Sequence, residues 1–247
     1  MILSVSRRTD IPCCYADWFM ARIRAGYVLT RNPMNHAQLS RIPLTPDVAD
    51  CIVFWTKDAY NIMPHLHELD GLGYHYYFQF TLTPYDRTIE TNLRPKEDIE
   101  RTFAMLSQRI GRDRVLWRYD PVLLCDSIDV AWHKAQFARM CNALAAHTDT
   151  VTISFLDRYA KMRASALRAP DEAEQHELAA FFARTAHAHG LRIAACCEAQ
   201  ELAQYGIERA SCIDRARVEH IIGQPLRAGA DKHQRTGCGC CESVDIG

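Results

Sequence analysis

The sequence lacks the features that mark several large classes of protein. It has no run of 18 apolar residues, so we expect no transmembrane helix. Its opening, MILSVSRRTDIP, places two arginines after a short apolar run, which is the reverse of the order in a secretory signal. It has no surplus of either charge, because 30 Asp and Glu residues balance 29 Lys and Arg residues to a net charge of -1. That balance argues against a broad surface for nucleic acid or anionic membrane. We therefore expect a cytoplasmic protein with neither as its partner.

Several motifs of common enzyme classes are also missing. The chain has no GxGxxG loop of dinucleotide-binding folds, no GxSxG nucleophile elbow and no Walker A phosphate loop. It shows no Ser-His-Asp signature, no internal repeat and no low-complexity segment. Its function must therefore be sought in residues whose positions depend on the fold.

What the sequence does contain is eight short runs of β-forming residues. Most are continuous apolar runs, which are typical of strands buried on both faces of a parallel sheet. They cover residues 2–5, 27–30, 51–55, 74–82, 115–119, 151–155, 191–195 and, most weakly, 209–212. Helical patterns lie at 17–25, 99–110, 137–144, 178–186 and 214–222.

This alternation predicts an α/β fold, and eight parallel strands are the number that closes a (β/α) barrel. We expect a TIM-barrel-like single domain over residues 1–223, followed by a cysteine-containing tail over residues 224–247 that forms neither helix nor strand. The nearest alternative is an open barrel of six or seven strands. A doubly wound sheet is less favoured, because no strand is followed by GxGxxG.

Active sites of (β/α) barrels lie at the carboxyl ends of the strands, and here every predicted strand runs into polar or titratable residues. Four basic side chains among them would form a ring suited to a small ligand that carries a carboxylate or phosphate. The candidate pocket residues are Arg7, Arg8, Asp10, Asn32, Lys57, Thr81, Arg118, Asp120, Ser154, Asp157 and Glu198.

Some of these charges also have a purely structural interpretation. Arg118 with Asp120, and Arg8 with Asp10, would then be ion pairs that serve only the fold. A further alternative is a metal-independent barrel hydrolase, since paired carboxylates do the acid–base work of glycoside hydrolysis. Its candidate residues would be Asp120, Asp157 and Glu198.

The chain has eleven cysteines, an odd number that does not fit a disulfide framework in a reducing compartment. Three cluster in the tail: Cys238, Cys240 and Cys241. Thiolates one or two residues apart can hold one soft metal centre, so these three are the candidate metal ligands. A fourth ligand would have to come from His233, from Cys196 or Cys197, or from outside the chain. The alternative is a tail of redox-prone thiols without metal.

Seven stretches together resemble the family called domain of unknown function 1848, over nearly the whole chain. They are SRRTDIP (6–12), RNP (31–33), FWTK (54–57), YYFQFTLT (76–83), WRYDP (117–121), SFLDRY (154–159) and the tail pattern QR-x-x-C-x-C-x-x-S-x-DIG (234–247). In that family a further cysteine run follows the DIG element and is similar to the iron–sulfur ligands of radical S-adenosylmethionine enzymes. The present sequence ends with the DIG element.

The resemblance implies a barrel whose C-terminal segment binds a [4Fe-4S] cluster, with S-adenosylmethionine as its second cofactor. On that basis we expect an iron–sulfur, radical S-adenosylmethionine-like enzyme that acts on a small anionic ligand at the barrel mouth, with a reductase as partner. The alternative is a barrel protein that binds a metal or cluster without catalysis.

Overall fold

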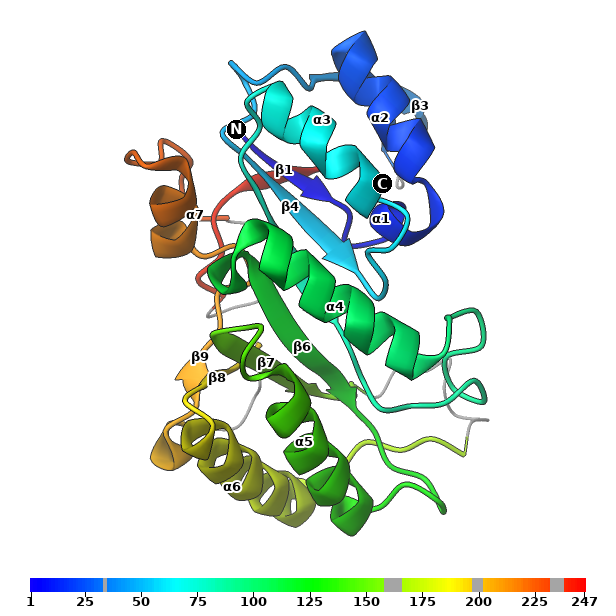
Figure 1. Ribbon diagram of the computed structural model, residues 1–247, viewed down its shortest axis with the longest axis vertical. Coiled ribbons are helices and arrows are strands. Elements are labelled where there is room, and N and C mark those ends of the chain that lie inside the picture. The colour runs from blue at the N-terminus through cyan, green and yellow to red at the C-terminus, as the bar shows by residue number, and fades with distance from the viewer. Residues whose placement is uncertain (33–34, 158–165, 197–201, 232–237) are drawn as a thin grey trace. The chain divides into compact units, whose positions relative to one another are not determined.

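The computed structural model describes residues 1–32, 35–157, 166–196, 202–231 and 238–247. The chain forms two compact units (Figure 1). The first comprises Met1–Phe80, Cys212–Gln234 and Gly239–Gly247, and the second comprises Thr81–Ser211 and Arg235–Cys238.

The large sheet has eight strands in the order β10-β1-β4-β5-β6-β7-β8-β9. Their bounds are β1 (Ile2–Val5), β4 (Cys51–Thr56), β5 (Tyr76–Thr81), β6 (Val115–Val122), β7 (Thr150–Phe155), β8 (Arg192–Ala195), β9 (Glu208–Arg209) and β10 (Ser243–Asp245). Within each unit, the neighbouring strands of this large sheet pair in parallel. The sheet is not closed into a barrel, so the α/β class is confirmed but the expected TIM barrel is not.

Five helices of the described residues lie where the 3.6-residue patterns predict them, whereas the two short helices at residues 11–14 and 66–71 match none of those patterns. The helices are α1 (Ile11–Cys14), α2 (Ala16–Ala25), α3 (Leu66–Gly71), α4 (Lys96–Ile110), α5 (Val130–Leu144), α6 (Glu172–Ala188) and α7 (Arg215–Ile222). The α2 helix ends at Gly26, whose φ of 75° is a left-handed conformation that glycine adopts without strain. Among the described residues, no helix has the length and apolar character needed to cross a membrane.

In the first unit, one face of the sheet packs against α2 through aromatic side chains. Phe54 of β4 contacts Phe19 of α2 edge to face at 5.5 Å, and it stacks on Phe78 of β5 at 4.8 Å. All three side chains are fully buried. Because side chains alternate along a strand, the residues next to Phe54 and Phe78 point to the opposite face.

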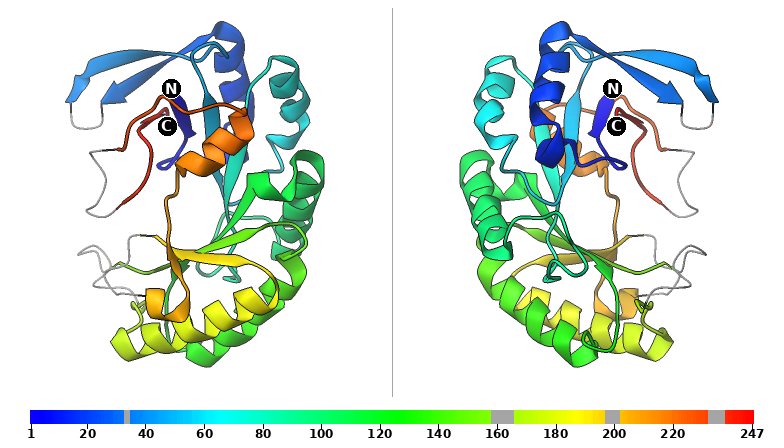
Figure 2. Two further views of the ribbon diagram at one scale, coloured as in Figure 1. Left: turned by 90° about the vertical axis from the view of Figure 1, so that its left-hand side faces the viewer. Right: turned by 90° about the vertical axis from the view of Figure 1, so that its right-hand side faces the viewer.

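In the second unit, α5 and α6 lie side by side against β6, β7 and β8 (Figure 2). Trp117 of β6 stacks on Phe137 of α5 at 5.4 Å, and Phe137 stacks on Phe182 of α6 at 4.2 Å. A buried polar link joins the same elements: the Tyr119 hydroxyl donates to His133 Nδ1 at 2.8 Å, while His133 Nε2–H donates to the Leu123 carbonyl at 2.8 Å. These contacts fix α5 on the strand that carries Arg118 and Asp120.

Three strand predictions need correction. The second predicted strand exists as β2 (Tyr27–Asn32), but it pairs antiparallel with β3 (Asn35–Pro43) in a separate two-stranded ribbon. The weak eighth strand is only the two-residue β9. The tail is not devoid of strands, because β10 pairs in parallel with β1 and places Asp245 beside Ser4. The residues of β10 show no strand pattern in the sequence, because this strand is short and polar and is stabilised by backbone pairing with a distant strand.

Candidate functional site

Polar residues of the first unit gather on the sheet face opposite α2. The parallel registers place Ser4 beside Asp245 on one side and beside Val53 on the other. Trp55 pairs with Gln79 on the same face two residues further along. We call this surface the polar face of the first unit. Thr81 is the last residue of β5, two residues after Gln79, and it is the first residue of the second unit.

Asp245 is the centre of a hydrogen-bond cluster where β1 ends. Its carboxylate accepts hydrogen bonds from Ser4 Oγ at 3.1 Å and Ser6 Oγ at 2.7 Å. It also accepts the backbone N–H groups of Arg7 at 2.8 Å and Gly247 at 3.0 Å. We call these residues the Asp245 cluster. It joins the chain's last strand to the loop that bears Arg7 and Arg8.

The two arginine side chains extend from this cluster. The Arg7 guanidinium lies 5.4 Å from the centre of the Trp55 ring. Arg8 lies 3.4 Å from Asp245 Oδ1, and its side chain remains 45% exposed. The expected partner of Arg8 was Asp10, so the structure assigns a different carboxylate to it. Both guanidinium groups therefore lie at the rim of the polar face, next to its most highly hydrogen-bonded carboxylate.

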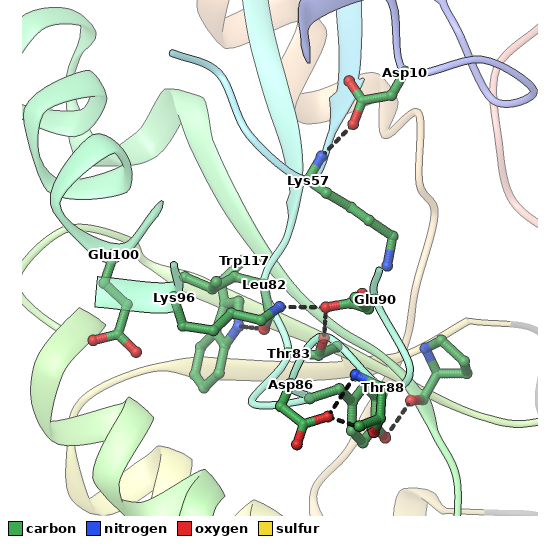
Figure 3. Close-up of polar contacts among 12 residues, drawn as sticks. Asp10, Lys57, Leu82, Thr83, Asp86, Thr88, Glu90, Lys96, Glu100 and Trp117 are labelled. Atoms are coloured by element: carbon green, nitrogen blue, oxygen red, sulfur yellow. Dashed lines mark hydrogen bonds and ion pairs between the residues drawn. The ribbon is translucent and has the colours of Figure 1, made fainter. Parts of the chain in front are cut away.

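Asp10 links the β1 loop to the end of β4. Its carboxylate accepts the Lys57 backbone N–H at 2.7 Å (Figure 3). It also accepts the Thr56 hydroxyl at 2.8 Å and the Cys13 backbone N–H at 3.0 Å. It thereby caps α1. Burial raises the pKa of this carboxyl above its usual value of 3.8, although the three donors oppose the shift. Asp10 is thus held in a fixed position and gains a proton more readily than an exposed aspartate.

The second unit has its own polar face, opposite α5 and α6. Arg118 of β6 pairs in register with Thr152 of β7, and Asp120 and Ser154 follow on the same face two residues later. Arg118 forms an ion pair with Asp120, and the Ser154 hydroxyl donates to the same carboxylate. The expected Arg118–Asp120 pair is therefore confirmed. Because the Arg118 side chain is 7% exposed and that of Asp120 is 23% exposed, the carboxylate is the part of this group that solvent reaches.

A third group fixes the loop after β5 and was missed at the sequence level. Glu90 accepts the Thr83 hydroxyl at 3.0 Å and pairs with Lys96 at the start of α4 (Figure 3). The Trp117 indole N–H donates to the Leu82 carbonyl at 2.9 Å and holds the same loop. Glu90 precedes α4 by six residues and follows no strand directly, so strand-end reasoning could not select it.

Nine of the eleven predicted pocket residues divide between the two units as follows. Arg7, Arg8, Asp10 and Lys57 lie in the first unit, whereas Thr81, Arg118, Asp120, Ser154 and Asp157 lie in the second. Asp157 is exposed just after β7. Asn32 ends β2 in the separate ribbon, so it does not lie at the carboxyl end of a strand in the large sheet. Glu198 lies outside the described residues.

The described tail cysteines do not assemble a metal site. Cys240 and Cys241 are only 2% and 3% exposed, and burial raises the pKa of the Cys241 thiol, which disfavours the thiolate that a metal requires. Cys238 is partly exposed and belongs to the second unit. Within the part of the chain that the structure describes, no three His, Cys, Asp or Glu side chains group in a way that could hold a metal ion. These residues by themselves do not fit an iron–sulfur cluster.

Backbone pairing places the two buried cysteines. The Cys241 N–H donates to the Ile213 carbonyl at 2.9 Å, and the Ile213 N–H donates to Cys240 Sγ at 3.5 Å. Glu242 N–H donates to the Gly229 carbonyl at 2.9 Å. The described tail is therefore ordered by strand-like contacts inside the first unit.

Comparison with known proteins gives a single type of match. No curated protein and no solved structure matches the chain. The family model described as Domain of unknown function (DUF1848) matches residues 2–247, which is almost the entire sequence. The chain that carries these two polar faces and the Asp245 cluster belongs to the DUF1848 family.

Proposed function

We propose that this protein is an enzyme that binds a small anionic molecule at the rim of the first unit's polar face. The observation that carries the proposal is the position of Arg7 and Arg8, whose backbone is fixed by the Asp245 cluster while both residues stay exposed. These consecutive residues each carry a guanidinium group, whose planar donor pairs match a carboxylate or a phosphate. A loop that is already ordered loses little entropy when the ligand binds.

The interior of the same face offers a complementary acceptor. Gln79 is 1% exposed, and its Nε2 group donates to the Cys212 carbonyl at 2.5 Å, which fixes the orientation of its amide. Its Oε1 atom is buried without a hydrogen-bond partner among the described residues. A buried acceptor left unpaired costs about 1–3 kcal/mol, so a donor from water or from a bound molecule would stabilise this position.

We take the reaction type from the family resemblance: radical chemistry that starts from S-adenosylmethionine. A [4Fe-4S] cluster with S-adenosylmethionine would supply a radical, with electrons from a reductase. The residues of this chain would bind the anionic substrate, orient it and exclude water. Because the described cysteines do not fit a cluster, we derive no reaction step through it.

The anion site can be tested with ligands of known charge. Thermal-shift measurements with inorganic phosphate, small dicarboxylates and sugar phosphates should identify an anion that stabilises the wild-type protein. We expect Arg7→Ala with Arg8→Ala to weaken its binding by roughly tenfold to a hundredfold, since a hydrogen bond to a charged group contributes about 1.5–3 kcal/mol. Arg209→Ala, an exposed arginine on β9, is the matched control. Unchanged affinity in the double variant would show that the anion site lies elsewhere.

A second candidate is binding of an iron–sulfur cluster without catalysis. Its support is the family resemblance alone, because Cys240 is buried and the described cysteines by themselves do not fit a cluster. Iron and sulfide analysis after anaerobic reconstitution tests this candidate separately from the anion site. A brown protein that does not turn over S-adenosylmethionine would support it.

A further inference from the structure

The β2–β3 ribbon presents a face whose composition differs from the rest of the surface. It is a two-stranded sheet separate from the large one, shown in blue in Figure 2. An isolated two-stranded hairpin has little stability in water, so its base must be anchored. Val28 on its inner face is buried against the first unit, and the Leu44 N–H just beyond β3 donates to the Gly26 carbonyl at 2.9 Å.

The opposite face of the ribbon alternates leucine with arginine. Leu29 pairs in register with Arg41, and Arg31 pairs with Leu39. Cross-strand partners point to the same side, so these four side chains form a checkerboard that we call the outer face. Leu29 and Leu39 are each 57% exposed, and both arginines are exposed. They are among the most exposed large apolar side chains in the described chain.

The charge of this region is one-sided. Residues 18–46 contain four arginines and neither aspartate nor glutamate, in a chain whose net charge is -1. Arg24 is paired with Glu68, but Arg31 and Arg41 lie on the outer face. The Arg41 guanidinium lies over the Tyr27 ring, 4.1 Å from its centre, which orders this long side chain before any partner binds. An ordered guanidinium loses less entropy when it donates hydrogen bonds to a carboxylate.

We propose that the outer face of the ribbon binds an acidic protein surface in which carboxylates alternate with apolar side chains. Carboxylates would pair with Arg31 and Arg41, while apolar groups would cover Leu29 and Leu39. Nucleic acid suits this face less well, because it is bound by rows of cations and by aromatic rings that stack on bases. Here each arginine has a leucine opposite it, and the Tyr27 ring is covered by Arg41.

The test uses two kinds of probe on the full chain. The first is a fluorescein-labelled peptide of alternating glutamate and valine, compared with a peptide of the same composition in two separate blocks. The second is labelled single-stranded and double-stranded DNA. Three double variants are compared with the wild type by fluorescence anisotropy: Arg31→Glu with Arg41→Glu, Leu29→Ser with Leu39→Ser, and Leu72→Ser with Arg209→Glu as the matched control on exposed residues elsewhere.

We expect the alternating peptide to bind better than the block peptide, and each ribbon variant to weaken its binding by about tenfold or more, the equivalent of about 1.4 kcal/mol. The control variant should bind like the wild type. Three results would overturn the proposal. They are no binding of the alternating peptide to the wild type, loss in the arginine variant alone, and tighter binding of DNA than of the peptide.

Discussion

Replacement of Asp245 by asparagine should loosen β10 from β1. The Asp245 Oδ2 atom accepts the Arg7 N–H and Oδ1 accepts the Gly247 N–H, in each case together with a serine hydroxyl. Asparagine keeps the shape but has only one acceptor oxygen, and its amino group cannot accept either N–H. Whichever way the amide turns, one backbone donor loses its partner.

The magnitude follows mainly from that lost backbone hydrogen bond, because the ion pair of Asp245 with the exposed Arg8 contributes little. A hydrogen bond to a charged group contributes about 1.5–3 kcal/mol, and the serine hydroxyls can rotate to accept the new amide. We therefore expect the free energy of unfolding of the first unit to fall by about 2–3 kcal/mol. Asp245→Ala should cost more, because it removes every one of these acceptors.

Urea unfolding combined with hydrogen exchange measures this prediction. Backbone amides of β10 and β1 should exchange faster in Asp245→Asn, while those of α5 and α6 in the second unit should not change. Glu242→Gln removes an exposed carboxylate three residues earlier in the same tail and is the control. If both variants unfold within about 0.5 kcal/mol of the wild type, which is the range of ordinary surface substitutions, the assigned role of the Asp245 cluster is refuted.

Three further predictions concern other parts of the chain. Burial lowers the pKa of His133 below its usual 6.5, so the unfolded state binds a proton more readily than the folded state. The stability of the wild type should therefore fall as the pH drops below 6.5, and His133→Gln should lose this dependence in urea titrations. Asp171→Ala removes the capping box that Asp171 forms with Glu174 at the start of α6 and should cost about 1 kcal/mol, measured by thermal unfolding. Anaerobic reconstitution of the 247-residue chain should give partial iron occupancy at most, which Cys238→Ala and Cys240→Ala should lower further.

Each of these predictions has a result that would contradict it. A His133→Gln protein with the same acid sensitivity as the wild type would mean that another group titrates. An unchanged melting temperature in Asp171→Ala would mean that the cap adds nothing beyond water. Stoichiometric iron that survives both cysteine replacements would move the cluster site away from the tail.

The sequence predicts the central elements of the fold because they are encoded locally. The apolar run at Cys51–Thr56 specifies a strand without help from distant residues. The apolar residues Ile99, Phe103, Leu106 and Ile110 recur every three or four positions and specify the helix α4 in the same way. The sequence could not reveal whether β2 joins the large sheet, because its apolar residues fit either environment. It also could not reveal that the sheet stays open. Closure would require pairing between the two edge strands, and such pairing depends on contacts between residues that are distant in the sequence.

In the candidate site, too, the sequence predicts what is local and misses what depends on distant residues. Arg118 and Asp120 are two residues apart on one strand, so period-2 alternation alone places them on one face. Asp245 was missed because its partners Ser4 and Ser6 precede it by about 240 residues. Asp245 is the aspartate of the DIG element, which the family resemblance singles out. Only the parallel pairing of β10 with β1 shows that its carboxylate binds the β1 loop.

The place of β10 also determines the order in which the first unit can form. During synthesis, β1 leaves the ribosome long before β10, the strand that covers one of its edges. Until then that edge, with its four buried residues Ile2–Val5, is an open template for pairing with other chains. Closing such a long loop is also entropically costly and slow. Nascent chains should therefore depend on chaperones until β10 emerges, and β1 is where we expect aggregation to begin when synthesis stalls before that point.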